Sequence, residues 1–277
     1  MAASENLKAL VAQMPNGGMY TNENDVDKER IEKTIAEIAK GGKENVLGLI
    51  DMLGEPGSEQ DAKPHYALHC LGNYILIAKD DSARRQFAET LASQLTSDRS
   101  KYIRGYLCQE LQWAGRKEAV PALAKLLLDE ELVDPAAMAL VAIKDGSSEA
   151  LRAALPQAKG RCRLVVFHSL AALGDAGSAA EFRAAIKDPD REVRLAACAG
   201  LAKIGDATAV DLLLQTAGAE PGWERIQAAK HCLVLAEKLL AAGKKQDAMK
   251  IYSSLRDSRS DPSEKYVRDL AEKALAG

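Results

Sequence analysis

A period of about thirty residues constrains this chain more than any other feature of its sequence. In three segments that align without gaps, an Arg precedes a Gly by eleven residues; the pairs are Arg104 and Gly115, Arg163 and Gly174, and Arg194 and Gly205. Apolar or small residues follow each Arg at three and seven positions, which is one face of an α-helix. A weaker copy has Lys144 in the glycine place, so the intervals are 29, 30 and 31 residues. Such a period predicts stacked supersecondary units.

Each unit has the pattern of a helix, a break and a second helix. The Gly at the break suits a left-handed helix cap. An Asp follows the glycine place in three units, at Asp145, Asp175 and Asp206, where it favours the start of the next helix. Looser copies flank the clear ones, which gives about seven helix pairs. A pair that is amphipathic on both sides must stack on its neighbours.

The composition supports an all-α fold. Ala and Leu, the strongest helix formers, supply 48 and 35 of the 277 residues, whereas Val and Ile supply 12 each. A parallel sheet would need runs rich in Val and Ile, which are absent from the sequence. No apolar run approaches the ~18–20 residues that a bilayer span requires. We therefore expect an α-α superhelix without a membrane span.

The repeated arginines are interpreted as a structural ladder. An Arg at a helix interface is tolerated when it is paired, and Asp98 and Asp188 each lie six residues before an Arg of the series. We expect the arginines to occupy equivalent places on successive first helices, each near an acid or a carbonyl of a neighbouring turn.

The segment from Asp188 to Asp206 resembles a known repeat. It reads Asp-Pro-Asp-x-x-Val-Arg-x-x-Ala-x-x-x-Leu-x-x-Ile-Gly-Asp, which is similar to the HEAT repeat and most of all to its PBS-lyase HEAT-like form. The resemblance implies a right-handed HEAT-like solenoid over residues 1–277. It would have a loosely matching N-terminal cap at 1–63, core repeats at 64–220, and C-terminal helices with a cap at 221–277. Second helices would line its concave face.

The same resemblance implies a non-enzymatic scaffold that binds a protein or peptide on the concave face. Cationic residues expected to be exposed on the second helices are the candidate binding residues: Arg84, Arg85, Lys117, Lys125, Arg152, Arg183 and Lys187. Two alternatives stay open. One is a bilin-lyase-like chaperone that holds a tetrapyrrole, and the other, less favoured, is a helical-repeat DNA glycosylase.

No catalytic, cofactor or metal motif occurs in the chain. Nucleophile-elbow, phosphate-loop and dinucleotide motifs are absent, so we expect no enzyme and no cofactor. His65 and His69 have a spacing that can bind a metal, but no third ligand is evident, and we expect no metal. The five cysteines form no disulfide or zinc pattern and are interpreted as buried thiols. With a net charge of -3 and both signs interspersed, nucleic-acid binding is not expected.

Two further features are the N-terminus and the aromatic residues. The N-terminus lacks the features of a signal peptide, which favours a cytoplasmic protein, although an exported mature form is left open. Aromatic residues are only 4% of the chain but crowd between 66 and 113. Aromatic side chains are enriched at binding hot spots; the favoured interpretation is nevertheless that they fill irregular packing between residues 54 and 98.

Overall fold

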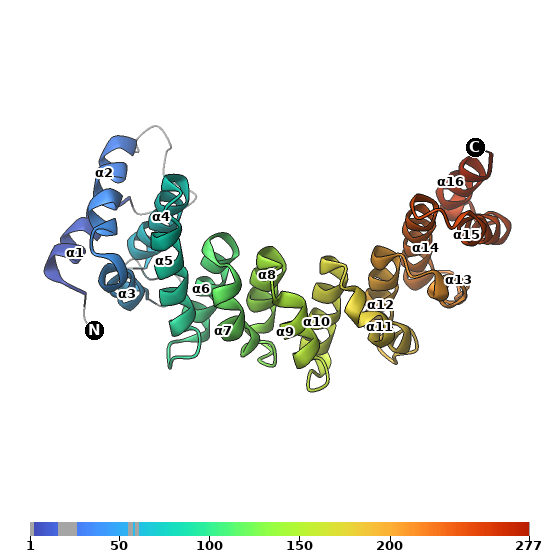
Figure 1. Ribbon diagram of the computed structural model, residues 1–277, viewed down its shortest axis with the longest axis horizontal. Helices are drawn as coiled ribbons and strands as arrows, with labels where there is room; N and C mark the ends of the chain where they lie inside the picture. The colour runs from blue at the N-terminus through green and yellow to red at the C-terminus, as the bar shows by residue number, and fades with distance from the viewer. Residues whose placement is uncertain (1–2, 16–26, 55–57, 59–60, 277) are drawn as a thin grey trace. The chain divides into compact units, whose positions relative to one another are not determined.

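The computed structural model describes residues 3–15, 27–54, 58 and 61–276, and its regular elements in these ranges are helices. Figure 1 labels them α1 to α16. The chain divides into two compact units, Met1–Ala150 and Leu151–Gly277, which are described separately as unit 1 and unit 2. The expectation of one continuous domain over 1–277 stays a prediction.

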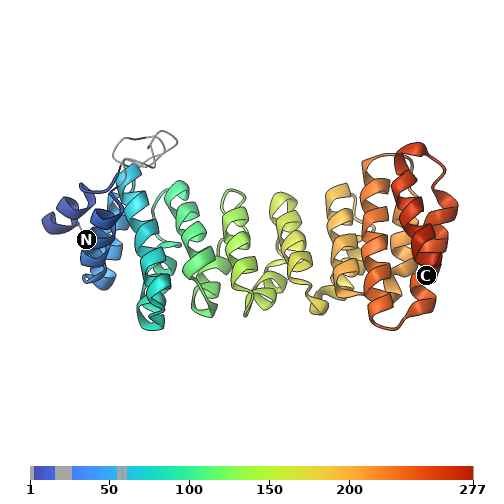
Figure 2. The same cartoon turned by 90° about the horizontal axis from the view of Figure 1, so that it is seen from above.

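Unit 1 is a stack of helices in which α4, α6 and α8 are successive first helices. In this unit α4 packs on α6 and α6 on α8, while α5 packs on both α4 and α6. Figure 2 shows these first helices side by side. The helices are α1 (Glu5–Val11), α2 (Lys28–Ala39), α3 (Gly42–Met52), α4 (Ala62–Ala78), α5 (Asp81–Gln94), α6 (Lys101–Ala114), α7 (Val120–Ala124) and α8 (Val133–Ile143). The next helix, α9 (Ser147–Ala154), contains the boundary between the units.

Unit 2 repeats the same arrangement with α10, α12 and α14 as first helices. Each packs on the next, and α11, α13 and α15 pack beside them. The small residues Ala196, Ala197 and Cys198 of α12 are fully buried and allow its neighbours a close approach. The helices are α10 (Gly160–Leu173), α11 (Ala179–Ala185), α12 (Arg191–Ile204), α13 (Val210–Ala217), α14 (Trp223–Ala241), α15 (Lys245–Ser258) and α16 (Lys265–Ala276).

Helix ends follow the predicted period with one exception. Gly174 and Gly205 cap α10 and α12 in the left-handed conformation, with φ of 66° and 71°. Lys144, in the glycine place of the weak copy, also has a positive φ of 68°. Gly115 departs from the expectation, since its backbone is extended. A Cβ there would lie 3.1 Å from Ile143 Cδ1 and 2.5 Å from the carbonyl oxygen of Leu111, so close packing accounts for this glycine.

Short 3-10 turns begin the second helices. They are Lys117–Ala119, Ala176–Ser178 and Ala207–Ala209, and a further turn, Pro262–Glu264, precedes α16. Asp206 accepts a hydrogen bond from the backbone N–H of Thr208, as its predicted position requires. Within the described ranges, no helix is both long and apolar enough to cross a bilayer.

Candidate functional site

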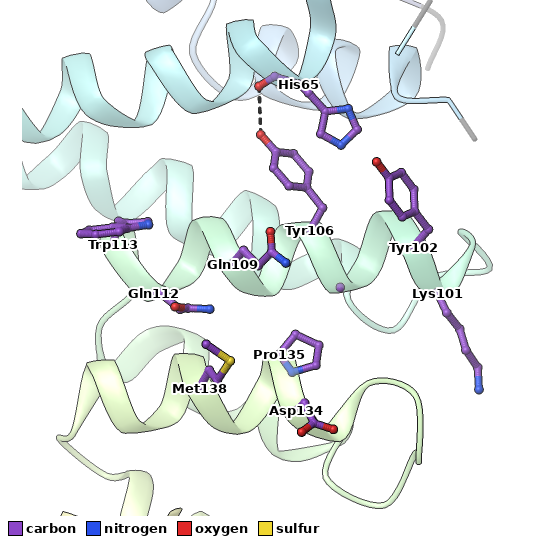
Figure 3. A pocket seen from close by; sticks show the side chains of 11 residues that line it. His65, Lys101, Tyr102, Tyr106, Gln109, Gln112, Trp113, Asp134, Pro135 and Met138 are labelled. Atoms are coloured by element: carbon purple, nitrogen blue, oxygen red, sulfur yellow. Dashed lines mark hydrogen bonds between the residues drawn. The ribbon is translucent and has the colours of Figure 1, made fainter. Parts of the chain in front are cut away.

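A groove of about 820 Å³ opens on the surface of unit 1 where α4, α6 and α8 adjoin. We call it the α6 groove, because α6 supplies most of its lining. Figure 3 shows side chains from three helices around it, with Tyr102 and Trp113 toward opposite ends of α6. The lining residues are His65, Lys101, Tyr102, Gly105, Tyr106, Gln109, Gln112, Trp113, Asp134, Pro135 and Met138.

Large apolar side chains lie open to solvent along this groove. The exposed fractions are 64% for Trp113, 58% for Met138 and 40% for Tyr102. The interpretation that aromatic residues between 66 and 113 fill irregular packing is therefore wrong for Tyr102 and Trp113. It holds for Phe87, which is 2% exposed. Clustered exposed apolar side chains are typical of binding surfaces.

One end of the groove is built by an aromatic cluster between α4 and α6. The ring centroids of His65 and Tyr106 are 4.1 Å apart, and those of His65 and Tyr102 are 5.8 Å apart. The Tyr106 hydroxyl donates to the backbone carbonyl of His65 at 2.9 Å (Figure 3). Burial, followed by the charge of Glu110, raises the pKa of Tyr106 strongly, so this phenol stays protonated and keeps its donor role.

The carboxylate of Asp61 orients this cluster. Asp61 is buried, and its carboxylate accepts from the backbone N–H of Gly54 at 2.7 Å and lies 2.8 Å from His65 Nδ1. The same histidine nitrogen lies 3.0 Å from the backbone carbonyl oxygen of Asp61. The Tyr102 hydroxyl donates to the other carboxylate oxygen of Asp61 at 3.3 Å. His65 Nε2 is buried and has no hydrogen-bond partner among the described residues. The arrangement holds the His65 ring rigidly at the groove wall.

A second buried carboxylate links α4 to α6 beside the groove. His69 Nδ1 lies 3.0 Å from Glu110 Oε1, and Glu110 is 6% exposed. Asn73 Nδ2 lies 3.0 Å from the other nitrogen of His69. The two histidines thus contact different carboxylates, and no group of three or more His, Cys, Asp or Glu side chains with metal-binding geometry occurs among the described residues. His65 and His69 are held by their own helix interface.

The predicted second-helix binding residues divide into two groups. Three of them form ion pairs within the solenoid and are not free surface cations: Arg84, Arg152 and Arg183. Arg84 is buried and donates to the carbonyl of Ala114 and to the Glu118 carboxylate. Its assignment to an exposed face is wrong. The structure leaves four of the predicted residues exposed: Arg85, Lys117, Lys125 and Lys187.

The two other arginines make equivalent contacts in successive repeats. Arg152 Nη1 lies 2.6 Å from a carboxylate oxygen of Asp175, and Arg183 forms an ion pair with Asp206. Both acids follow the capping glycines, 23 residues after their arginines. A partner would have to compete with these ion pairs to use either cation.

The predicted first-helix ladder is present in unit 2. Arg163 forms an ion pair with Asp188, and Arg194 donates to the backbone carbonyl of the same Asp188 at 2.7 Å. Arg194 also contacts Glu224 through two hydrogen bonds of 2.6 and 2.7 Å. The Asp188 side chain therefore pairs with the Arg of the preceding repeat, and its backbone carbonyl accepts from the Arg of its own repeat.

The ladder is not complete in unit 1. Arg104 Nε is buried without a hydrogen-bond partner in the described part of the chain. The predicted partner, Asp98, is exposed. Two other ion pairs occur here, because Lys101 Nζ contacts Asp129 at 2.9 Å and Glu131 at 2.8 Å.

The five cysteines are free thiols, as the sequence predicts. Burial raises the pKa of Cys108 to about 12 and that of Cys198 to about 11. Cys232 is raised to about 12, mainly by burial. Cys70 is half-buried, and burial also raises its pKa. These thiols therefore pack as small apolar groups.

Comparison with protein families finds a match that begins at the end of unit 1 and covers much of unit 2. Residues 148–234 match the family described as HEAT repeats. This segment is therefore similar to HEAT repeats. It runs from α9 into α14, and the resemblance predicted from the sequence is confirmed. The finer PBS-lyase-like form stays a prediction.

A solved karyopherin structure shares this fold. The karyopherin Kap121p, bound to the extreme C-terminus of the protein phosphatase Cdc14p, aligns with a TM-score of 0.57 at 10% identity. The alignment covers 98% of this chain but 35% of the karyopherin, so the chain spans about a third of that protein. This likeness confirms the predicted α-solenoid class.

Two further structures align more loosely. An engineered protein has a TM-score of 0.48 at 21% identity, with 98% of this chain and 77% of that chain covered. The complex of CpcE and CpcF of phycocyanin lyase from a Nostoc species has a TM-score of 0.43 at 19% identity, with 82% and 94% covered. A search of curated proteins finds no match.

Proposed function

We propose that this protein is a non-enzymatic HEAT-repeat scaffold that binds a peptide segment of a partner protein in the α6 groove. The observation that carries the proposal is the row of exposed apolar side chains, Tyr102, Trp113 and Met138, around a groove of about 820 Å³. Trp and Tyr supply much of the energy of binding hot spots. A groove lined by apolar groups with a few polar ones is the usual form of a ligand site.

The site proposed here differs from the second-helix face favoured by the sequence. Arg84, Arg152 and Arg183 are held in ion pairs within the solenoid, and removing them would disturb packing as well as any interface. The α6 groove offers exposed apolar side chains instead. A repeat protein of similar fold, the karyopherin, is solved with the end of another protein bound, which supports a peptide as the ligand.

A displayed library of random peptides tests the proposal. The full-length protein is compared with Trp113→Ala and with the matched control Trp223→Ala. Trp223 is 56% exposed, begins α14 of unit 2 and is not one of the residues that line the groove. Exposed substitutions change stability by roughly 0.5 kcal/mol or less, so both variants should fold. Peptides enriched on the wild type should be retained by Trp223→Ala and lost by Trp113→Ala.

Other results would move the site or replace the function. Peptides that Trp113→Ala retains, but that a combined Arg85→Ala, Lys117→Ala and Lys125→Ala variant loses, would restore the second-helix face. If no peptide is enriched on the wild-type protein, the proposal of peptide binding fails. The tetrapyrrole alternative is examined with biliverdin. An absorption shift that requires Trp113 would identify a pigment, rather than a peptide, as the ligand of the groove.

A further inference from the structure

The spacing of the aromatic side chains on α6 fits an extended ligand. Tyr102, Tyr106 and Trp113 lie on one face of the helix, four and then seven residues apart. At 1.5 Å per residue these steps are about 6 and 10 Å, or about 16 Å in all. A polyproline II chain rises about 3.1 Å per residue, so roughly five residues cover that distance, and one of its turns matches the longer step. An α-helical ligand would need roughly eleven residues for the same span.

The polar groups between the rings are suited to a ligand whose carbonyls are unpaired. Gln109 and Gln112 present side-chain amides, and Trp113 presents an indole N–H. No side-chain hydrogen bond involves these three residues in the described ranges. A polyproline II chain makes no internal hydrogen bonds, so its carbonyls need donors from outside. Proline has no N–H that would require an acceptor in return.

The lining carries little unbalanced charge. Lys101 points away from the rings in Figure 3 and is engaged by Asp129 and Glu131. One acid, Asp134, also lines the groove. A strongly acidic or basic segment would lose hydration without gaining a matched partner. The lining therefore favours an uncharged segment.

Gly105 opens the floor of the groove between the two tyrosines. A glycine within a helix costs about 1 kcal/mol relative to alanine. A Cβ at Gly105 would lie 3.8 Å from Leu132 Cδ2 and 3.8 Å from Pro135 Cγ, which is ordinary contact. Packing within the protein therefore does not require glycine here. The space that a methyl group would take is available to a ligand ring.

We propose that the α6 groove accepts an uncharged, proline-rich segment in the polyproline II conformation, with proline rings against Tyr102, Tyr106 and Trp113. The inference rests on the proposed function and specifies its ligand class. The indole N–H and the glutamine amides donate to ligand carbonyls, and the absent side chain of Gly105 gives one ring its place.

Fluorescence of Trp113 tests the inference directly. The chain has two tryptophans, so the full-length Trp223→Phe variant reports from the groove alone. Two uncharged peptides of roughly ten residues are titrated: one with proline at two of every three positions, and one with each proline replaced by alanine. The proline-rich peptide should change the Trp113 emission and bind about tenfold more tightly. Gly105→Ala in the same background should weaken it by a similar factor without lowering the unfolding midpoint.

The outcomes separate the inference from the proposed function. If the alanine peptide binds as tightly as the proline-rich one, or if library peptides that depend on Trp113 lack proline, the inference is overturned while the groove remains a peptide site. If the proline-rich peptide leaves Trp113 unchanged up to about 1 mM, the inference is overturned as well. If no library peptide depends on Trp113, the proposed function itself fails.

Discussion

Gly200→Ala should destabilise unit 2, although replacing glycine by alanine stabilises most helices. Gly200 lies within α12, and a Cβ there would be 2.5 to 2.6 Å from three ring carbons of Phe182. Carbon atoms in contact normally stay about 3.5–4.0 Å apart. Phe182 is fully buried, and its ring packs against Phe167 with centroids 5.9 Å apart. The ring must therefore shift into occupied space.

The two opposing terms set the magnitude. Overpacking a core costs about 1–3 kcal/mol, and alanine regains about 1 kcal/mol of helix propensity. Contacts as short as 2.5 Å with a fully buried ring favour the upper half of that cost, about 2–3 kcal/mol, so we expect a net loss of about 1–2 kcal/mol. Gly105→Ala is the matched control, because its nearest contacts would be at 3.8 Å; it should gain about 0.5–1 kcal/mol. Phe182→Leu should make Gly200→Ala less harmful, with a coupling of about 1 kcal/mol.

Urea unfolding followed by circular dichroism measures these changes, with hydrogen exchange in α12 as the local probe. The midpoint should fall for Gly200→Ala and rise for Gly105→Ala. A Gly200→Ala protein as stable as the wild type would refute the packing argument. Equal losses in the wild-type and Phe182→Leu backgrounds would show that Phe182 is not the obstructing group.

Three other predictions concern the ladder, the thiols and metals. Arg194→Ala should cost about 1–2 kcal/mol. The Arg194 hydrogen bonds lower the pKa of Glu224, so this stability is complete above the usual glutamate pKa of about 4.3 and is lost as pH falls through the lowered value; urea midpoints of the two proteins that stay equally far apart from pH 7 to pH 3 would contradict the pairing. The buried thiols with raised pKa values are Cys108, Cys198 and Cys232. They should resist iodoacetamide at pH 8 in the folded protein and react on unfolding, as measured by mass spectrometry. Rapid alkylation of the folded protein would contradict their raised pKa values. A chelator should leave the melting temperature unchanged, and a fall of many degrees in calorimetry would reveal a metal held by the native protein.

The fold was predictable because the repeat signal lies in local chemistry. The left-handed caps at Gly174 and Gly205 agree with the glycine that the repeat places at the end of each first helix. Even Lys144, which stands in the glycine place of the weak copy, has the positive φ expected there. Gly115 differs because its backbone is extended; a Cβ there would lie 3.1 Å from Ile143 Cδ1, a close approach that the sequence does not reveal.

The site was harder to predict because exposure is a property of the packed stack. Residues 102, 106, 109 and 113 form a stripe at helical spacing, which is equally consistent with a core face. In the structure, the packing of the helices leaves Tyr102 and Trp113 exposed to solvent, so the stripe is not a core face. One signal was available, since the two glutamine amides beside Trp113 are unusual on a core face. The tie from Arg152 to Asp175 was also readable, because Arg183 and Asp206 repeat its spacing of 23 residues.

Methionine methyl NMR on the full-length protein tests the central claim, that a peptide binds in the α6 groove, most directly. Met138 is 58% exposed in the groove, Met14 is buried in unit 1, and Met249 lies on α15 of unit 2. With methyl-labelled methionine, a peptide selected on the wild-type protein should shift the Met138 signal and leave those of Met14 and Met249 in place. A shift of Met249 with Met138 unchanged would place the binding surface in unit 2 and contradict the account.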